Sequence, residues 1–234
     1  MYNRKFFFLL SFCEAKKKSI HSLTKLARPM FITRRLVSSL AIASLAAPPT
    51  RRAGAFDLAL DVTFRADVND DTCSELIKAV EQRVVQRAAL LAQLQPEGTR
   101  VLPPIHLHVT SRGGSLIAGL RAYDYLSNVD QLHTHVDGIV ASAATLLTLA
   151  GSHRLMTAHS MMLVHQPSIY LEDDLKATDL RDHAVNMKKL VSHLIEIYNA
   201  TTLLTADDIA AMISNEQMMT ASEALAYGFV NEIE

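Results

Sequence analysis

Along residues 58–233, segments whose apolar residues are spaced as in strands alternate with segments, mostly longer, whose apolar residues are spaced as in helices. Apolar and polar residues alternate at 58–68 and 105–109, whereas at 72–93 the apolar residues recur every three or four positions. Similar patterns predict further strands at 132–140, 154–156, 161–164 and 229–233, and further helices at 116–126, 143–150, 173–199, 209–213 and 221–227. Because strand-to-helix crossovers repeat, we expect an α/β fold of repeated β-α-β units, with a largely parallel sheet and helices outside it.

The first 52 residues differ in charge from the rest of the 234-residue chain. They contain eleven Lys and Arg residues and a single acidic residue, a net charge of +10, whereas residues 53–234 carry a net charge of −11. Their apolar runs, residues 6–13 and 36–47, are too short to span a bilayer. Basic, acid-poor segments of this kind are typical of targeting sequences. We therefore expect residues 1–52 to be a targeting presequence or a disordered leader, and residues 53–234 to form one domain.

The composition of this leader favours import into an organelle. The mitochondrial matrix is the first candidate and the plastid is the alternative. A wrongly chosen upstream start codon, with Met30 as the true initiator, is the other explanation of the leader. The mature domain is expected to have no contact with a membrane.

The composition of the predicted domain argues against several functions. Its negative charge makes nucleic-acid binding a poor prospect, since nucleic-acid-binding proteins neutralise phosphates with clustered Lys and Arg. Cys73 is its only cysteine, so no internal disulfide can form. No group of residues has the spacing of a metal site, so we expect no metal, and we expect His133, His135 and His153 at the surface.

Three short motifs at the ends of predicted strands carry the candidate chemistry. Gly113 and Gly114 follow the strand at 105–109, and two adjacent glycines allow positive φ and a close approach of backbone. Ser142 stands among alanines where a strand gives way to an apolar helix, and His165 ends a short strand before Pro167. A serine, a histidine and backbone N–H groups free to donate are the components of a serine hydrolase site.

Four longer motifs occur in order over roughly residues 64–234: SRGGSLIAGLRAYDYL, GIVASAAT, MMLVHQP and MMTASEALAYGFVNEI. Their order and spacing resemble those of the proteolytic subunit of the Clp protease, in the crotonase-like superfamily. The resemblance implies a crotonase-like fold of repeated β-α-β units, in which residues 173–199 form a protruding handle helix.

The resemblance also implies roles for five residues. Ser142 stands at the position of the nucleophile and His165 at the position of the general base. Gly114 and Ala143 would supply the two backbone N–H groups of the oxyanion hole. Counted back from the last motif, the position of the family's aspartate falls on Glu216, which would orient the histidine. Other candidates for this third role are Asn215, Asp207 and Asp208.

The same resemblance implies an assembly and a partner. Family members form heptameric rings, homomeric or mixed, that stack through the handle helix, and an AAA+ unfoldase delivers unfolded protein to them. Cleavage itself would need no cofactor, because ATP is used by the unfoldase. His106 and His108 stand where the family often has tyrosines that line the unfoldase docking pocket, so we expect an altered pocket.

Two departures from the family pattern lie close to the predicted site. Arg112 replaces the proline of the family's Ser-Pro-Gly-Gly motif, and residues 168–170 (Ser-Ile-Tyr) replace a Gly-Gly pair that accompanies the substrate-binding strand. We therefore weigh three functions. The first is a serine endopeptidase of an ATP-dependent Clp-like protease that acts in protein quality control. The second is a non-catalytic ring subunit, and the third is an acyl-CoA hydratase or isomerase of the crotonase type.

Overall fold

The computed structural model describes residues 60–93, 103–169, 174, 176–216 and 218–234, and the predicted leader (1–52) lies outside them. The strands are β1 (Asp61–Phe64), β2 (Ile105–Ser111), β3 (Leu132–Ala141), β4 (His153–Met156), β5 (Met161–Leu163), β6 (Met218–Thr220) and β7 (Glu232–Ile233). The helices are α2 (Asp70–Gln93), α3 (Leu116–Leu126), α4 (Ala144–Leu149), α5 (Ala177–Thr201), α6 (Ala206–Ile213) and α7 (Ala221–Ala226).

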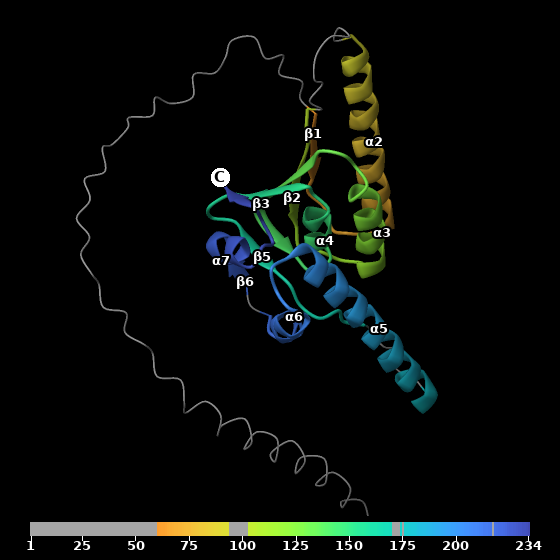
Figure 1. Ribbon diagram of the computed structural model, residues 1–234. Helices are drawn as coiled ribbons and strands as arrows, with labels where there is room; N and C mark the ends of the chain where they lie inside the picture. The colour runs from red at the N-terminus through yellow and green to blue at the C-terminus, as the bar shows by residue number, and fades with distance from the viewer. Residues whose placement is uncertain (1–59, 94–102, 170–173, 175, 217) are drawn as a thin grey trace, which may run out of the picture. The chain divides into compact units, whose positions relative to one another are not determined.

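These strands form one sheet in the order β1-β2-β3-β4-β7, in which every neighbouring pair is parallel. The first half of β3 pairs with β4 and its second half pairs with β5, also in parallel. Among the strands that the structure describes, only β6, which pairs with β5, is antiparallel. The predicted α/β fold with a largely parallel sheet is therefore confirmed (Figure 1).

The alternating pattern of β2 separates two faces of the sheet. Ile105, Leu107 and Val109 are fully buried, while His106 and His108 on the other face are partly exposed. This alternation arises because a strand sends successive side chains to opposite sides of the sheet. The buried face packs against α2 and α4. Helix α3 packs in turn on both of these helices.

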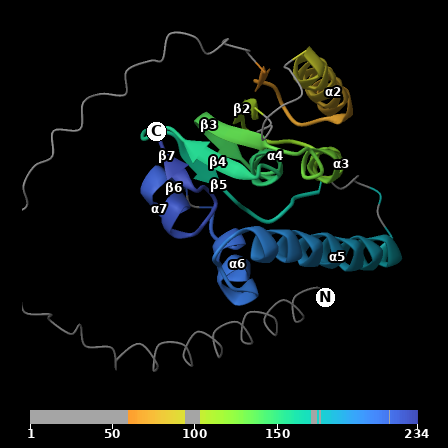
Figure 2. The ribbon, with the colours of Figure 1, turned by 45° about the horizontal axis from the view of Figure 1, so that its top comes forward.

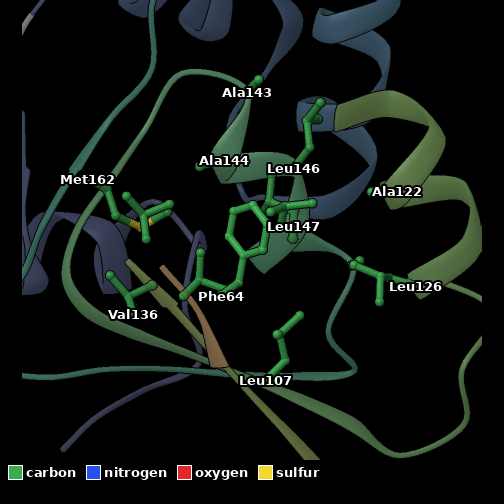
Figure 3. Packing of buried hydrophobic residues seen from close by; sticks show 14 of the residues in the cluster. Phe64, Leu107, Ala122, Leu126, Val136, Ala143, Ala144, Leu146, Leu147 and Met162 are labelled. Carbon is green, nitrogen blue, oxygen red and sulfur yellow. The ribbon is translucent and has the colours of Figure 1, made fainter. Parts of the chain in front are cut away.

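The core is centred on α4, the short helix that follows Ser142. Every one of its six residues is buried, including its two threonines, whose hydroxyls donate to backbone carbonyls. Figure 3 shows the ring of Phe64 from β1 among Leu146 and Leu147 of α4 and Val136 of β3. Packing on all sides makes α4 a firm support for the turn that precedes it.

Helix α5 contacts the rest of the domain mainly through its C-terminal end. Leu194 and Tyr198 are its buried residues, whereas Leu180 and Val185 in its N-terminal half are 48% and 47% exposed. In Figures 1 and 2 the helix extends away from the sheet, with α6 beside its C-terminal end. The predicted helix at 173–199 thus exists but is observed as Ala177–Thr201. No helix within the described parts of the chain is long and apolar enough to cross a membrane.

The sequence pattern misplaced or missed elements near the C-terminus. It did not predict β6, because three residues are too few to establish a periodicity. The predicted strand at 229–233 is observed only as Glu232–Ile233. Phe229 and Val230 are buried instead in the segment that links α7 to β7.

Candidate active site

Parallel strands bring Ser142 and His165 to the same edge of the sheet. Ala141 at the end of β3 is the register partner of Leu163 at the end of β5, and the N–H of Ser142 donates to the Leu163 carbonyl at 2.8 Å. His165 follows two residues later. The Ser142 hydroxyl therefore lies 2.8 Å from Nε2 of His165, within hydrogen-bond distance.

The backbone of Ser142 has a conformation that side-chain-bearing residues rarely adopt. Its φ is +57°, and Gln131 is the only other non-glycine residue with positive φ in the described ranges. Such a conformation costs about 1–3 kcal/mol, so the surrounding structure must hold it. Thr145 of α4 does so, since both its N–H and its hydroxyl donate to the Ser142 carbonyl, at 3.0 and 2.7 Å. The turn from β3 into α4 thus presents the serine side chain at the sheet edge.

Glu216 lies in the segment between α6 and β6, and β6 runs antiparallel to the strand β5 that precedes His165. Leu163 at the end of β5 faces Met218 at the start of β6, and His165 and Glu216 each lie two residues beyond this pair. Oε1 of Glu216 lies 3.2 Å from Nδ1 of His165. The imidazole side chain is 24% exposed and the glutamate side chain 74% exposed, so this contact is open to solvent.

The other predicted candidates for the acid make different contacts. The side chain of Asn215 donates to the Ala211 carbonyl at 2.9 Å, at the end of α6. Asp208 accepts from the hydroxyl and the N–H of Thr205 in a capping box, and these hydrogen bonds lower the pKa of its carboxyl. Asp207 lies in the first turn of the same helix. Among the described residues, Glu216 is the carboxylate that contacts His165.

Gly113 and Gly114 follow β2 and pack closely against the Ser142 turn and against Val68, respectively. Their φ angles are +98° and +147°, and they pair with Val68, whose N–H donates to the Gly113 carbonyl at 2.8 Å. A Cβ at Gly113 would lie 2.6 Å from that of Ser142, and one at Gly114 would lie 2.3 Å from the Val68 carbonyl oxygen. Both positions therefore require glycine.

Two backbone donors near the serine are available to a ligand. Within the described residues, the N–H groups of Gly114 and Ala143 donate to no other protein atom. Ala143 is a buried residue, and buried N–H groups are nearly always paired in folded proteins, so its open donor beside a nucleophile candidate is notable, whereas Gly114 is exposed. Gly114 and Ala143 are the two residues that the resemblance predicts for the oxyanion hole, and that role stays a prediction.

A pocket of about 420 Å³ opens beside these groups. It is lined by Arg112, Gly114, Ser115, Leu116, Ser142, Ala143, His165, Pro167, Ser168, Leu194 and Tyr198. Leu194 and Tyr198 come from α5, and the pattern of the sequence did not identify them as part of the site. Their apolar spacing predicted only a buried helix face, since nothing in it specifies what that face covers.

Tyr198 connects α5 to the serine turn. Its hydroxyl lies 2.8 Å from the hydroxyl of Thr145, which itself donates to the Ser142 carbonyl. Burial raises the pKa of the Tyr198 phenol to about 12, so the phenol stays neutral at physiological pH. With the Thr145 proton directed at Ser142, Tyr198 is the donor in its own hydrogen bond.

The exposed face of the sheet carries a second cluster, which we call the histidine face. It comprises His106, His108, His133, His135 and His153 with Asp137, Glu232 and Glu234. Nδ1 of His108 lies 2.7 Å from Asp137, Nδ1 of His106 lies 2.8 Å from Nε2 of His135, and the rings of His108 and His135 stack at 4.4 Å. The expectation that His135 is a surface residue is wrong, because neighbouring rings bury it.

The described residues offer little to a metal ion as they are arranged. No group of three or more His, Cys, Asp or Glu side chains among them is positioned to hold one. Cys73, the cysteine of the described part, is a free and buried thiol. Burial raises its pKa, which keeps it protonated and unreactive.

Comparisons with known proteins agree with the motifs. A model of the Clp protease family matches residues 71–234. The chain is 35% identical over 133 residues to the ATP-dependent Clp protease proteolytic subunit 1 of Chlamydia pneumoniae, which covers 56% of this chain and 70% of that protein. It is 31% identical over 162 residues to the proteolytic subunit 3 of Rhodococcus jostii, covering 68% and 77%. A solved structure of a ClpP1 mutant from Listeria monocytogenes shares the fold, with a TM-score of 0.59, 20% identity and coverage of 75% of this chain and 91% of that chain.

Proposed function

Because the chain belongs to the Clp protease family, we propose that it is a serine endopeptidase that hydrolyses unfolded polypeptides. The observation that carries the proposal is the hydrogen-bond distance of 2.8 Å between the Ser142 hydroxyl and Nε2 of His165. A serine hydroxyl is a weak nucleophile until a neighbouring base removes its proton. The positive φ of Ser142 adds support, since strained backbone is concentrated at functional sites.

The proposed reaction proceeds through an acyl-enzyme. Ser142 Oγ attacks the scissile carbonyl carbon while Nε2 of His165 takes its proton. The carbonyl oxygen becomes negatively charged and accepts hydrogen bonds from the N–H groups of Gly114 and Ala143. His165 then returns the proton to the leaving amine, and the C–N bond breaks.

In the second half of the cycle, water is the nucleophile and Ser142 is the leaving group. His165 takes a proton from a water molecule, whose oxygen attacks the ester carbon of acylated Ser142. The C–O bond breaks and the proton returns to Ser142, which releases the second product. Glu216 holds the imidazole with Nδ1–H directed at its carboxylate, so that Nε2 is free to accept. Neither step requires a cofactor.

We extend the proposal to partners and location. The chain would assemble into heptameric rings and receive unfolded protein from an AAA+ unfoldase, with ATP hydrolysed by the unfoldase alone. His106 and His108 of the histidine face would alter the family's docking pocket. The leader at 1–52 would direct the protein to an organelle, the mitochondrial matrix first and the plastid second.

Two other functions compete with a peptidase. A non-catalytic ring subunit is favoured by the solvent exposure of Glu216 and by Arg112 in place of the family's proline. An acyl-CoA hydratase or isomerase of the crotonase type would need a carboxylate in the pocket. The lining described for the pocket contains none, which argues against that chemistry.

Labelling with a fluorophosphonate probe tests the proposal, because the probe reacts only with an activated serine. We expect an adduct on Ser142, located by peptide mass spectrometry, and its loss in both S142A and H165A. Hydrolysis of a fluorogenic peptide should be lost in parallel. An assembled protein that gives neither an adduct nor cleavage would favour the non-catalytic subunit, and thioester turnover without peptidase activity would favour the crotonase chemistry.

A further inference from the structure

The pocket beside Ser142 contains a positive charge that the proposed reaction does not use. Arg112 comes directly after β2 and lines the pocket together with Ser142, His165 and Ser168. Gly113, the next residue, lies so close to Ala141 and Ser142 that it could not carry a Cβ, and Gly114 lies equally close to the backbone of Val68. The start of the Arg112 side chain is therefore held at a constrained position relative to the nucleophile candidate.

No negative charge offsets Arg112 within the pocket. No carboxylate is among the described residues that line it, and Arg112 forms no ion pair with any described residue. Glu216 contacts Nδ1 of His165, the ring nitrogen that faces away from Ser142. The charge presented to a bound chain at the site is thus positive.

The charged residues of a neighbouring pocket do not change the net positive charge at Arg112. Arg112 also borders a hollow of about 430 Å³, whose lining includes Arg65 and Asp67. Those two residues carry opposite charges, so together they contribute no net charge. Arg112 remains the unbalanced cation between the two hollows.

We propose that Arg112 determines specificity, favouring substrates with an acidic side chain next to the scissile bond. The inference rests on the proposed peptidase function. A guanidinium presents a planar set of donors that matches a carboxylate, and it stays charged at any physiological pH. A lysine or arginine of the substrate at the same place is repelled, since like charges at this range disfavour binding.

The test uses three internally quenched peptides that differ at a single position next to the cleaved bond. That position carries Glu in the first peptide, Gln in the second and Lys in the third. The wild-type protein should cleave the Glu peptide about two- to fivefold more efficiently than the Lys peptide, the scale expected for a solvent-exposed ion pair. R112E should reverse the order, and R112Q should remove it. The Lys78→Glu variant, an equal change of charge at an exposed position of α2, should keep the wild-type order.

Each outcome separates this inference from the function on which it rests. Cleavage of the uncharged Gln peptide by all four proteins shows that the peptidase reaction is intact. If the Glu-to-Lys ratio is then the same in R112E as in the wild type, Arg112 does not read substrate charge and the inference is overturned. If no peptide is cleaved by any of the proteins, the proposed function fails and the inference with it. A preference that weakens as NaCl is raised would support an electrostatic origin.

Discussion

Glu216 is far more exposed to solvent than the imidazole it contacts. Its side chain is 74% exposed, and it reaches Nδ1 of His165 at 3.2 Å from the segment between α6 and β6. Water screens such a contact, so it stabilises an imidazolium less than a buried carboxylate would. The length of the side chain matters as well, because its terminal oxygen Oε1 makes the contact with Nδ1 of His165.

Substitution of Glu216 should therefore lower kcat without abolishing activity. For the peptidase, we expect E216Q and E216A to reduce kcat by about 10- to 100-fold, less than the loss of about 10⁴ known for a buried triad aspartate. E216D should resemble E216A more than the wild type, since an aspartate here is one methylene too short. Peptide hydrolysis with separate kcat and KM values would measure this.

Asp207 provides the matched control for Glu216. It is the nearby acidic residue that sequence reasoning also offered, and it lies in the first turn of α6. D207N should keep wild-type kcat. Equal activity of E216A and wild type would contradict an orienting role for Glu216, and a loss in D207N but not in E216A would move that role to Asp207.

At the scale of elements, the histidine face shows how strands of one sheet assemble titratable groups. Register pairs His106 of β2 with His133 of β3, and His108 with His135, so that alternation on each strand collects the imidazoles on one side. His135 faces His106, His108 and Glu234, with Asp137 beyond His108. Burial, then the charge of the neighbouring rings, lowers the pKa of His133.

Burial also lowers the pKa of His135, and the charge of the nearby His108 lowers it further. A lowered pKa in the folded state means that the unfolded chain binds protons first as the pH falls. The free energy of unfolding should therefore be at its full value above the ordinary histidine pKa of about 6.5 and should decrease as the pH falls below it.

Chemical denaturation at pH 7.5 and pH 5.5 tests this prediction. Wild type should be less stable at the lower pH, and H135Q should show a smaller difference between the two. At pH 7.5, H135Q should already be less stable by about 1–2 kcal/mol, since His106 and Glu234 lose a hydrogen-bond partner. H159Q, at an exposed histidine outside the histidine face, should keep the wild-type difference. An unchanged pH dependence in H135Q would show that His135 does not contribute to it.

At the scale of the whole molecule, α5 is a helix whose apolar side chains are only partly covered within one copy of the chain. Leu180 and Val185 expose nearly half of their surface on a helix whose C-terminal end alone is buried. Apolar side chains of this kind on a protruding element are typical of a surface that another chain covers. The proposed stacking of rings through the handle helix would cover them.

Charges on this helix should therefore weaken the assembly. We expect L180D and V185D to reduce the mass measured by size-exclusion chromatography with light scattering, from stacked rings to single rings, because an unpaired carboxylate is costly to bury. N186D adds the same charge at an exposed polar position of α5 and should leave the mass unchanged. Wild-type mass in both leucine and valine variants would rule out this helix as the stacking surface.

The local pattern of the sequence was sufficient for most of the elements and for the family. Helix α3 was predicted with its observed bounds, and β2, β3 and α2 within two residues at each end, because their apolar spacing and caps are local properties of the chain. The motifs around Ser142 and His165 are local too, and the membership of the Clp protease family that they indicated is confirmed. The catalytic roles of these residues stay a prediction.

Contacts between distant segments were decided only by the tertiary structure. Glu216 could be distinguished from Asn215, Asp207 and Asp208 only once β6 paired with β5, and three residues are too short for a pattern to predict that pairing. The burial of His135, and the position of Tyr198 behind the Ser142 turn, likewise depend on side chains from other elements. The physical reason is the same for all of them. Periodicity tells which face of an element is buried, but only the packed sheet and helices determine which residues meet there.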